Sequence, residues 1–395
     1  MDMQTGLPVV GMVGGGQLAR MTHQASIALG QSLSVLAAGE RESAGLVAGK
    51  VVAGSHTDLS ALRSFAGSVD VLTFDHELVP NEFVRTLCEE GVVVRPGPDA
   101  LLHAQDKLTM RTKLAELGCP TPAFATVTRV ADAVEFAAAH GWPVVLKAVR
   151  GGYDGKGVWM LASEEQAHSL VTELLEAGMT LLVERKVPMR RELSALIARS
   201  PFGQGAAWPV VETVQRDGIN TEVLAPAPGL AEDLAHQAKS LALRIADELG
   251  VVGVLAVELF ETEDGVLVNE LAMRPHNSGH WTMNGAVTSQ FEQHLRAVLD
   301  YPLGTTEALA PACVMANVLG AAEPPAMGID ERLHHLFARF PDVHVHLYGK
   351  QERPGRKLGH VNVLGRSFAE LTERARLAAH WLANGYWQDG YRVHG

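Results

Sequence analysis

The sequence predicts an α/β protein in three parts: a Rossmann-like domain with a parallel sheet over residues 1–104, a larger nucleotide-binding domain over 105–305, and a small carboxy-terminal domain over 306–395. Strand and helix signals alternate through the first hundred residues, which is typical of a parallel sheet. The middle of the chain instead combines short apolar strands with a glycine-rich loop. A break containing proline and glycine at residues 301–304 precedes the last part.

The first unit of the amino-terminal domain is a strand, a turn and a helix. The apolar strand at residues 9–13 ends at Gly14-Gly15-Gly16, and the helix that follows runs to residue 29, where Gly30 stops it. Glycines at such a turn let an anion approach the backbone N–H groups at the positive end of the helix. Three interpretations stay open: a phosphate site, an NAD site with Glu40 as the ribose-binding carboxylate, and a tight crossing without a ligand.

The remaining elements follow from apolar periodicity and from glycine and proline stops. We expect strands at residues 32–36, 51–53, 69–74, 92–95, 143–147, 181–184 and 342–348, and helices at residues 59–66, 107–117, 229–249 and 368–382. In the helix at 229–249, apolar residues recur every three or four positions, so this stripe belongs to the core.

Composition limits the functions that the chain can have. Its 395 residues are 47% apolar and 20% charged, which is too apolar for intrinsic disorder, and 33 basic against 45 acidic residues give a net charge of −12. A general nucleic-acid binder is therefore not expected. We find no apolar run near the roughly 18 residues of a membrane span and no secretory signal, so we expect no membrane association and a cytoplasmic location. The wide spacing of Cys88, Cys119 and Cys313 argues against a disulfide framework or a structural zinc site.

A second glycine-rich loop gives a stronger signal than the first. In Gly151-Gly152-Tyr153-Asp154-Gly155-Lys156-Gly157, four glycines surround a lysine shortly after the strand that ends at Lys147. Backbone N–H groups of such a loop can contact phosphate oxygens, and a lysine in a partly dry site attracts them strongly. We interpret the segment as a mobile lid over phosphates. A hairpin with an exposed lysine is the alternative.

Two glutamates interrupt strands that should be buried. Glu258 and Glu270 lie in apolar runs joined by the polar turn Glu263-Asp264-Gly265, which predicts a β-hairpin. A buried carboxylate is costly unless it is paired or binds a metal. Together with Asn269, these side chains offer hard oxygen ligands and leave room for water and polyphosphate, which suits Mg²⁺. Two surface glutamates on the outer face of the hairpin are the alternative.

A dense polar loop follows the hairpin. Arg274, His276 and Asn277 suit a small planar anion, because a guanidinium binds carboxylate-like oxygens in a fork. Zinc ligation by His276 and His280 is disfavoured, because no carboxylate or cysteine nearby completes a convincing ligand set. An ordinary capped turn with surface histidines is the second alternative.

The turn at residues 349–360 concentrates four basic residues in a protein of net negative charge. Its functional interpretation is a clamp on a substrate phosphate, beside the amino-terminal glycine turn. A solvated loop is the alternative, because runs of charge usually face water.

These motifs together resemble the ATP-grasp superfamily, and closely the family of ATP-dependent 5-(carboxyamino)imidazole ribonucleotide synthases of purine biosynthesis. The resemblance covers nearly the whole chain. The His-Asn-Ser-Gly-His string and the last turn are specific to the family, whereas the glycine loop alone indicates only the superfamily. The motifs that carry the resemblance are Gly14-Gly15-Gly16-Gln17-Leu18, Asp106-Lys107, Tyr153-Asp154-Gly155-Lys156-Gly157, Asn269-Glu270, Arg274-Pro275-His276-Asn277-Ser278-Gly279-His280-Trp281 and residues 353–360.

The resemblance implies an ATP-grasp fold and a carbon–nitrogen ligase. ATP would phosphorylate bicarbonate, and the carboxyphosphate or its CO₂ would carboxylate the exocyclic amine of aminoimidazole ribonucleotide, with ADP and phosphate as the other products. Mg²⁺, or Mn²⁺ in its place, would accompany ATP. The resemblance further implies a homodimer whose product passes to a separate mutase.

The resemblance also implies a role for each matching residue. ATP would contact Lys107, Lys147, Tyr153, Asp154, Gly155, Lys156, Gly157, Val158, Trp159, Glu184, Arg185, Lys186, Val187, Glu192, Asn269 and Glu270. The metal would be held by Glu258 and Glu270. The catalytic groups would be Arg274, His276, Asn277 and Lys350. The ribonucleotide would be bound by Gly16, Gln17, Leu18, Glu77, Tyr153, Asp154, Lys156, Lys350, Arg356 and Lys357.

One segment departs from the family pattern. Relatives commonly have a glutamate, an aromatic residue, a glutamate and an asparagine where this chain has Asp75-His76-Glu77-Leu78, so the first acid is shorter here. Three rival functions are a formate-dependent purine transformylase of the same superfamily, an NAD-dependent oxidoreductase and a nucleotide sensor without catalysis.

Overall fold

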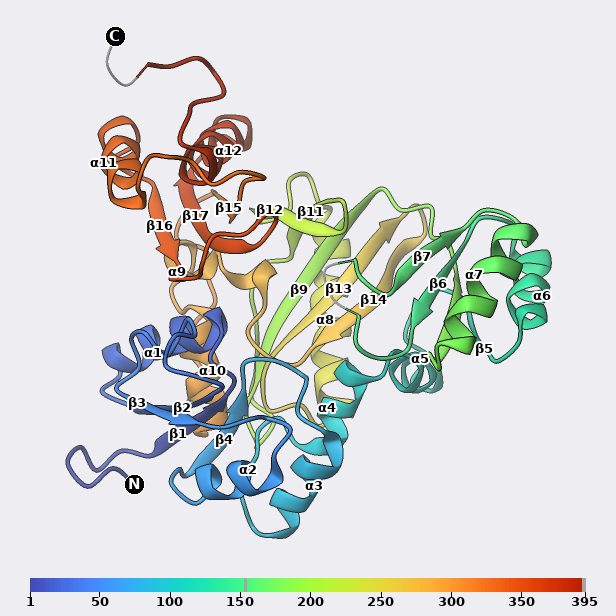
Figure 1. The fold of residues 1–395 in the computed structure, drawn as a ribbon, viewed down its shortest axis with the longest axis horizontal. Helices are drawn as coiled ribbons and strands as arrows, with labels where there is room; N and C mark the ends of the chain where they lie inside the picture. The colour runs from blue at the N-terminus through green and yellow to red at the C-terminus, as the bar shows by residue number, and fades with distance from the viewer. Residues whose placement is uncertain (153–154, 393–395) are drawn as a thin grey trace.

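The computed structural model describes residues 1–152 and 155–392, which form three sheets with helices packed on them (Figure 1). Tyr153 and Asp154, which the sequence assigns to the lid, lie outside the described residues. The predicted mixed α/β class with a parallel amino-terminal sheet is confirmed. Within the described residues, we find no helix with the length and apolar character that crossing a membrane requires.

The amino-terminal domain contains a parallel four-stranded sheet in the order β3-β2-β1-β4. The predicted strand at residues 92–95 is wrong. Only Val94 forms an isolated bridge, with Leu72, because Pro96 then lacks the N–H that a continuing ladder needs. The elements of this domain are β1 (Val9–Val13), α1 (Gln17–Ala28), β2 (Ser32–Ala37), β3 (Lys50–Ala53), α2 (Leu59–Ala66), β4 (Val71–Phe74), α3 (Asn81–Glu89) and α4 (Pro98–Gln105).

A small antiparallel sheet in the order β5-β8-β6-β7 projects from the opposite side of the molecule (Figure 1). Its core packs against α6 and α7. This part of the chain consists of α5 (Lys107–Glu116), β5 (Phe124–Val127), α6 (Val130–His140), β6 (Val144–Ala148), β7 (Val158–Leu161), α7 (Glu164–Glu176) and β8 (Leu181–Arg185).

A nine-stranded sheet forms the centre of the molecule. The carboxy-terminal strands do not form a sheet of their own, because β15 pairs with β12 and extends the same ladder to β17 and β16. The central elements are β9 (Arg191–Arg199), β10 (Gly205–Ala207), β11 (Val211–Arg216), β12 (Ile219–Ala225), α8 (Glu232–Glu248), β13 (Gly253–Thr262), β14 (Gly265–Ala272), the 3₁₀ turn Asn277–Gly279, α9 (Thr282–Gly285) and α10 (Gln290–Val298). The carboxy-terminal elements are β15 (Ala312–Leu319), α11 (Ile329–Arg339), β16 (His344–Leu347), β17 (Lys357–Gly365) and α12 (Phe368–Asn384).

Helix α8 covers one face of the large sheet. Its predicted apolar stripe is buried, and Leu241 and Ile245 share a core cluster with Val257 and Leu259 of β13. Because side chains alternate along a strand, Glu258 is turned to the opposite face of the sheet. The large sheet therefore has an apolar face under α8 and a face that carries acidic groups.

A buried arginine fastens α5 to both antiparallel sheets. Arg111 is fully buried, and its Nε lies 2.5 Å from the Glu184 carboxylate on β8. Its Nη1 and Nη2 donate to the carbonyl oxygens of Val268 and Asn269 on β14, at 2.9 and 2.7 Å. One side chain thus satisfies a buried carboxylate and two backbone acceptors.

Replacing this arginine tests its importance for stability. We expect Arg111→Met to lower the free energy of unfolding by about 3–5 kcal/mol, because it leaves a buried carboxylate and two carbonyls with fewer partners. Urea denaturation followed by circular dichroism measures the change. Arg85→Met is the matched control, since it breaks a 2.7 Å ion pair with Asp99 at the surface and should cost at most about 1 kcal/mol. Equal losses in the two variants would contradict the assignment.

Candidate functional site

A cavity of about 1210 Å³ is lined by residues on or next to strands of all three sheets. Most residues that the sequence assigned to binding or catalysis line it, although they come from segments more than 300 positions apart. The predicted residues that line the cavity are Gln17, Leu18, Glu77, Lys107, Lys147, Gly155, Val158, Glu184, Arg185, Lys186, Val187, Glu192, Glu258, Asn269, Glu270, Arg274, His276, Asn277 and Lys357.

The large sheet supplies the acidic wall of this cavity. Glu258 and Glu270 are directly opposite each other in the β13–β14 ladder, so their side chains share a face. The register then shifts, because Leu259 pairs with Val268 and leaves Asn269 as an extra residue. Such a bulge changes the direction of side chains, and here it lets the consecutive residues Asn269 and Glu270 both reach the cavity. Arg111 donates to the carbonyl oxygens of the consecutive residues Val268 and Asn269 and so supports the bulge.

Two lysines face this wall. Lys107, at the start of α5, donates to Glu270 Oε1. Lys147, at the buried end of β6, lies 2.7 Å from Glu184 and 3.2 Å from Asn269 Oδ1. Burial alone would raise the pKa of Glu184, but the charges of Lys147 and Arg111 outweigh burial and hold that pKa below its usual value. Glu184 is therefore a charged anchor for Lys147.

The facing carboxylates are poised to hold a cation. Burial, followed by the charges of Glu270 and Glu192, raises the pKa of Glu258 to about 8. A divalent ion would remove this repulsion. Among residues 1–152 and 155–392, no three His, Cys, Asp or Glu side chains are grouped to hold a metal by themselves. Two carboxylates completed by water and phosphate oxygens are the usual arrangement for Mg²⁺, so the residues present fit that ion.

The loop after β14 forms the next part of the cavity wall. Arg274 Nε donates to Glu77 Oε2 at 2.7 Å, whereas Glu77 Oε1 is buried and has no hydrogen-bond partner within the described part of the chain. The Ser278 amide donates to His276 Nδ1 at 3.4 Å, which places the ring proton on Nε2, 3.3 Å from Glu258. Burial, then Arg274 and Lys357, lowers the pKa of His276 to about 3. His276 is a neutral donor here.

The amino-terminal glycine turn already contains an acid. Asp75 accepts hydrogen bonds from the Gly16 and Ala19 amides at 2.7 and 2.8 Å, and a Cβ at Gly16 would collide with this carboxylate. Two of the backbone amides predicted to bind a phosphate therefore already donate to Asp75, the residue that departs from the family pattern. The next side chain, Gln17, reaches the cavity and accepts a hydrogen bond from Lys350 Nζ.

Six predicted site residues do not line the cavity: Gly16, Lys156, Gly157, Trp159, Lys350 and Arg356. Trp159 packs against the core of the small sheet, because neighbouring side chains of β7 alternate and it is Val158 that faces the cavity. Arg356 donates to the Gln351 carbonyl within its own turn at 3.2 Å. Lys350 lies beside the cavity through its contact with Gln17.

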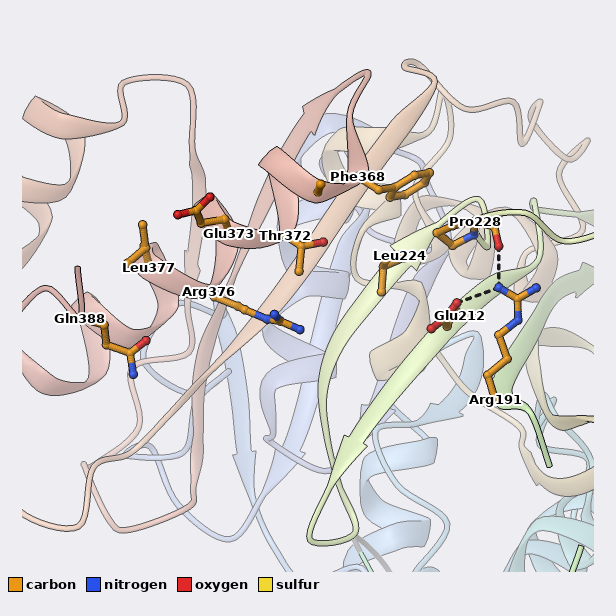
Figure 2. A pocket seen from close by; sticks show the side chains of 11 residues that line it. Arg191, Glu212, Leu224, Pro228, Phe368, Thr372, Glu373, Arg376, Leu377 and Gln388 are labelled. Carbon is orange, nitrogen blue, oxygen red and sulfur yellow. Dashed lines mark hydrogen bonds and ion pairs between the residues drawn. The ribbon is translucent and has the colours of Figure 1, made fainter. Parts of the chain in front are cut away.

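A second, smaller pocket of about 640 Å³ lies between the large sheet and α12 (Figure 2). Arg191 donates to Glu212 and to the Pro228 carbonyl at 2.9 and 2.6 Å. Arg376 makes two bonds to Glu222 at 2.7 and 2.8 Å. Both arginines of this pocket are already held by internal acceptors, and the large cavity is the candidate active site.

Sequence reasoning missed several groups at this site. Arg111 is an ordinary helix position in the sequence, and Asp75 was noted only as a departure. Gln290, which contacts the His276 backbone, lies 14 positions beyond it in α10. The alternation of β13 and β14 was the signal for the glutamates, but no local pattern identifies a partner that arrives from another element.

Three family models match successive parts of the chain. They are the ribonucleotide synthetase preATP-grasp domain over residues 7–105, the ATP-grasp domain over 112–291 and the phosphoribosylaminoimidazole carboxylase C-terminal domain over 313–374. The first model covers the parallel sheet, the second covers the small sheet together with β9–β14 of the large sheet, and the third covers strands that extend the large sheet.

Relatives of similar length match nearly the whole chain. N5-carboxyaminoimidazole ribonucleotide synthase from Mycobacterium tuberculosis is 64% identical over 98% of this chain and 90% of its own length. The crystal structure of the synthetase from Thermus thermophilus is 38% identical with a TM-score of 0.85, covering 96% of this chain and 99% of the other. The Aspergillus clavatus synthase in complex with ADP and 5-aminoimidazole ribonucleotide is 28% identical with a TM-score of 0.84, covering 95% and 98%. With this identity over almost its full length, the chain belongs to the N5-carboxyaminoimidazole ribonucleotide synthase family of ATP-grasp proteins.

Proposed function

We propose that the protein is an ATP-dependent carbon–nitrogen ligase that carboxylates 5-aminoimidazole ribonucleotide with bicarbonate in purine biosynthesis, releasing ADP and phosphate. The observation that carries the proposal is one cavity in which a repelling pair of carboxylates and two lysines adjoin Arg274 and neutral His276. The family relationship supplies the substrates, since relatives with this name include one solved with ADP and the ribonucleotide.

ATP would lie between the two antiparallel sheets. The backbone of residues 185–187 would receive the adenine, Glu192 the ribose hydroxyls, and Lys107 and Lys147 the phosphates. Glu258 and Glu270 would hold Mg²⁺, or Mn²⁺, which when bound neutralises charge on the phosphates and orients them. The glycine-rich segment that includes Lys156, Gly157 and the undescribed Tyr153 and Asp154 would cover them.

The reaction requires two anions to meet. An oxygen of bicarbonate would attack the γ-phosphorus, and the bond to the bridging oxygen of ADP would break, giving carboxyphosphate. The amine nitrogen would then attack its carbonyl carbon, phosphate would leave, and the amine proton would pass to that phosphate. Arg274, His276 and Asn277 would bind the bicarbonate-derived group, and Glu77 Oε1 is an available acceptor for the amine. A closed lid would protect carboxyphosphate from water.

The ribonucleotide phosphate would be clamped where the first and last domains meet. Lys350 and Gln17 are in contact there, Leu18 and Lys357 line the adjoining cavity, and Arg356 and Gly16 are their neighbours in the chain. We also propose that the functional domains are divided after residues 104 and 305. We further propose a homodimer in the cytoplasm that passes its product to a separate mutase. The three free cysteines suit a reducing compartment.

The substrate requirement is tested by measuring ADP release while each reactant is omitted in turn. We expect turnover to need ATP, bicarbonate and 5-aminoimidazole ribonucleotide together, and formate not to replace bicarbonate. Turnover that is indifferent to the ribonucleotide would overturn the assignment. Activity with formate would favour the transformylase, and protection against melting by NADH but not by Mg-ATP would favour an oxidoreductase.

The raised pKa of Glu258, which burial and then the charges of Glu270 and Glu192 cause, predicts a pH dependence of stability. Without divalent ions, the folded protein holds this proton up to about pH 8, whereas the unfolded chain releases it near 4.5. Unfolding therefore releases a proton between these values, and the free energy of unfolding should fall as the pH rises through this range. Mg²⁺ with ADP should reduce the decline, and Glu258→Gln should remove this contribution while abolishing turnover. Glu248→Gln, at an exposed position of α8, is the control and should keep the slope. An unchanged slope in Glu258→Gln would argue against the raised pKa of Glu258.

Removal of the lysine at the domain junction tests the phosphate clamp. We expect Lys350→Ala to raise the KM for the ribonucleotide about tenfold or more and to leave the KM for ATP nearly unchanged, because a charge-assisted hydrogen bond is lost. Lys50→Ala, at an exposed position of β3, is the control and should alter neither value. An unaltered ribonucleotide KM in Lys350→Ala would rule the clamp out.

A further inference from the structure

His280 is a buried side chain of the cavity wall to which the proposed mechanism gives no role. Only 1% of the residue is exposed, and it is one of the residues that line the cavity. It stands where the loop after β14 meets the carboxy-terminal strands, with its ring centroid 5.0 Å from that of His360 and 6.4 Å from that of Tyr348. Tyr348 in turn lies beneath Lys350. His280 is therefore close to the proposed ribonucleotide clamp.

The neighbouring Gln290 fixes the tautomer of His280. The His276 amide can only donate, so the Gln290 oxygen that lies 2.8 Å from it must be Oε1, the acceptor. The Gln290 Nε2 group then donates to the His276 carbonyl and to His280 Nδ1, both at 2.9 Å. Because His280 Nδ1 accepts, the ring proton resides on Nε2.

The sequence motif provides the space for this arrangement. A Cβ at Gly279 would lie 2.4 Å from Gln290 Oε1, so the glycine of the His-Asn-Ser-Gly-His string allows the amide to approach both histidines. Gln290 is itself completely buried, and its backbone amide donates to Thr282 Oγ1 at 2.9 Å. Hydrogen bonds thus hold Gln290 both at its backbone amide and at its side-chain amide.

Within residues 1–152 and 155–392, the proton on Nε2 has no acceptor, because no hydrogen bond to this atom is formed there. Burial, followed by His276, Lys357, His346 and Arg274, holds the pKa of His280 well below its usual value, so the ring stays neutral. Two of these neighbours, Lys357 and Arg274, are cations, and Arg274 is paired with Glu77 at 2.7 Å. The ring thus offers a neutral donor at a wall that carries cationic groups, where an anionic acceptor can bind.

We propose that His280 donates a hydrogen bond from Nε2–H to an anionic substrate oxygen, and that Gln290 is a positioning residue that keeps the ring in the tautomer that can donate. The proposal rests on the proposed function for the identity of that oxygen. The carboxyl group derived from bicarbonate and the phosphate of the ribonucleotide share this chemistry. A neutral donor can bind either without adding to the positive charge that Arg274 and Lys357 already provide.

The tautomer is tested without turnover, by long-range ¹H–¹⁵N correlation spectra of the histidine rings in the full-length protein. We expect His280 to appear as the Nε2–H form, like His294, whose Nδ1 accepts from the Val254 amide at 3.1 Å and which serves as an internal reference. Gln290→Glu replaces the donor to Nδ1 with an acceptor and should move the His280 proton to Nδ1 or protonate both nitrogens. An Nδ1–H form of His280 in the unaltered protein would overturn the proposal.

Binding is tested by adding bicarbonate, inorganic phosphate or 5-aminoimidazole ribonucleotide separately and following the His280 ring signals. A shift of the Nε2 resonance with the ribonucleotide and with inorganic phosphate would identify the phosphate as the acceptor. A shift with bicarbonate would identify the carboxyl group. If no reactant, alone or with Mg-ADP, moved this resonance, the proposed contact would be absent.

The contact is also tested by steady-state kinetics of two matched variants, His280→Asn and His280→Gln. His280→Asn retains a side-chain amide near Nδ1 but loses the distal donor, and we expect a rise of about tenfold in the KM of the substrate that contributes the anionic oxygen. His280→Gln can place an amide near Nε2 and should recover part of that loss. Equal KM values in a folded His280→Asn protein and the unaltered one would refute the contact. If the unaltered enzyme showed no ribonucleotide-dependent turnover, the proposed function would fail, while the spectra would still decide the tautomer.

Discussion

Repulsion between two neighbouring, partly buried carboxylates is the constraint on which the rest of the site depends. Glu258 and Glu270 are placed side by side by the β13–β14 ladder, and nothing in their own strands neutralises them. Lys107 reaches Glu270 from α5, and Lys147 reaches Asn269 from β6. Elements from different parts of the chain must therefore assemble around this wall, and their assembly creates the cavity.

Most ionic groups around the cavity have a partner of opposite charge, because an unpaired charge is costly to bury. Glu184 has Arg111 and Lys147 as partners, and Glu77 has Arg274. Among these groups only Glu258 keeps a strongly raised pKa, because of its burial first and then the charges of Glu270 and Glu192. A site that binds a metal–polyphosphate complex needs such an uncompensated acid, since a fully satisfied one would compete with the ion.

Much of this organisation could be predicted from the sequence because it is written in local patterns. Glu258 could be singled out because it interrupts the apolar strand β13. Glycine and proline stops predicted the bounds of α1 and α8 closely. The prediction of a strand at residues 92–95 was wrong because it gave weight to the apolar residues and not to Pro96, which cannot continue a ladder. The bulge at Asn269 and the partners Arg111, Asp75 and Gln290 were beyond reach, since each depends on atoms supplied by a distant segment. Trp159 shows the same limit, because a motif places a residue near the site but does not give the direction of its side chain.

The continuous ladder from β14 to β16 has a mechanical consequence. The acid wall and the strand that starts at Lys357 belong to one hydrogen-bonded plate, so the distance between the two ends of the cavity is set by strand spacing and cannot vary freely. The small sheet shares no strand with this plate. The distance from the small sheet to the acid wall is therefore set by side-chain contacts, such as those of Arg111 and Lys147, and not by backbone pairing.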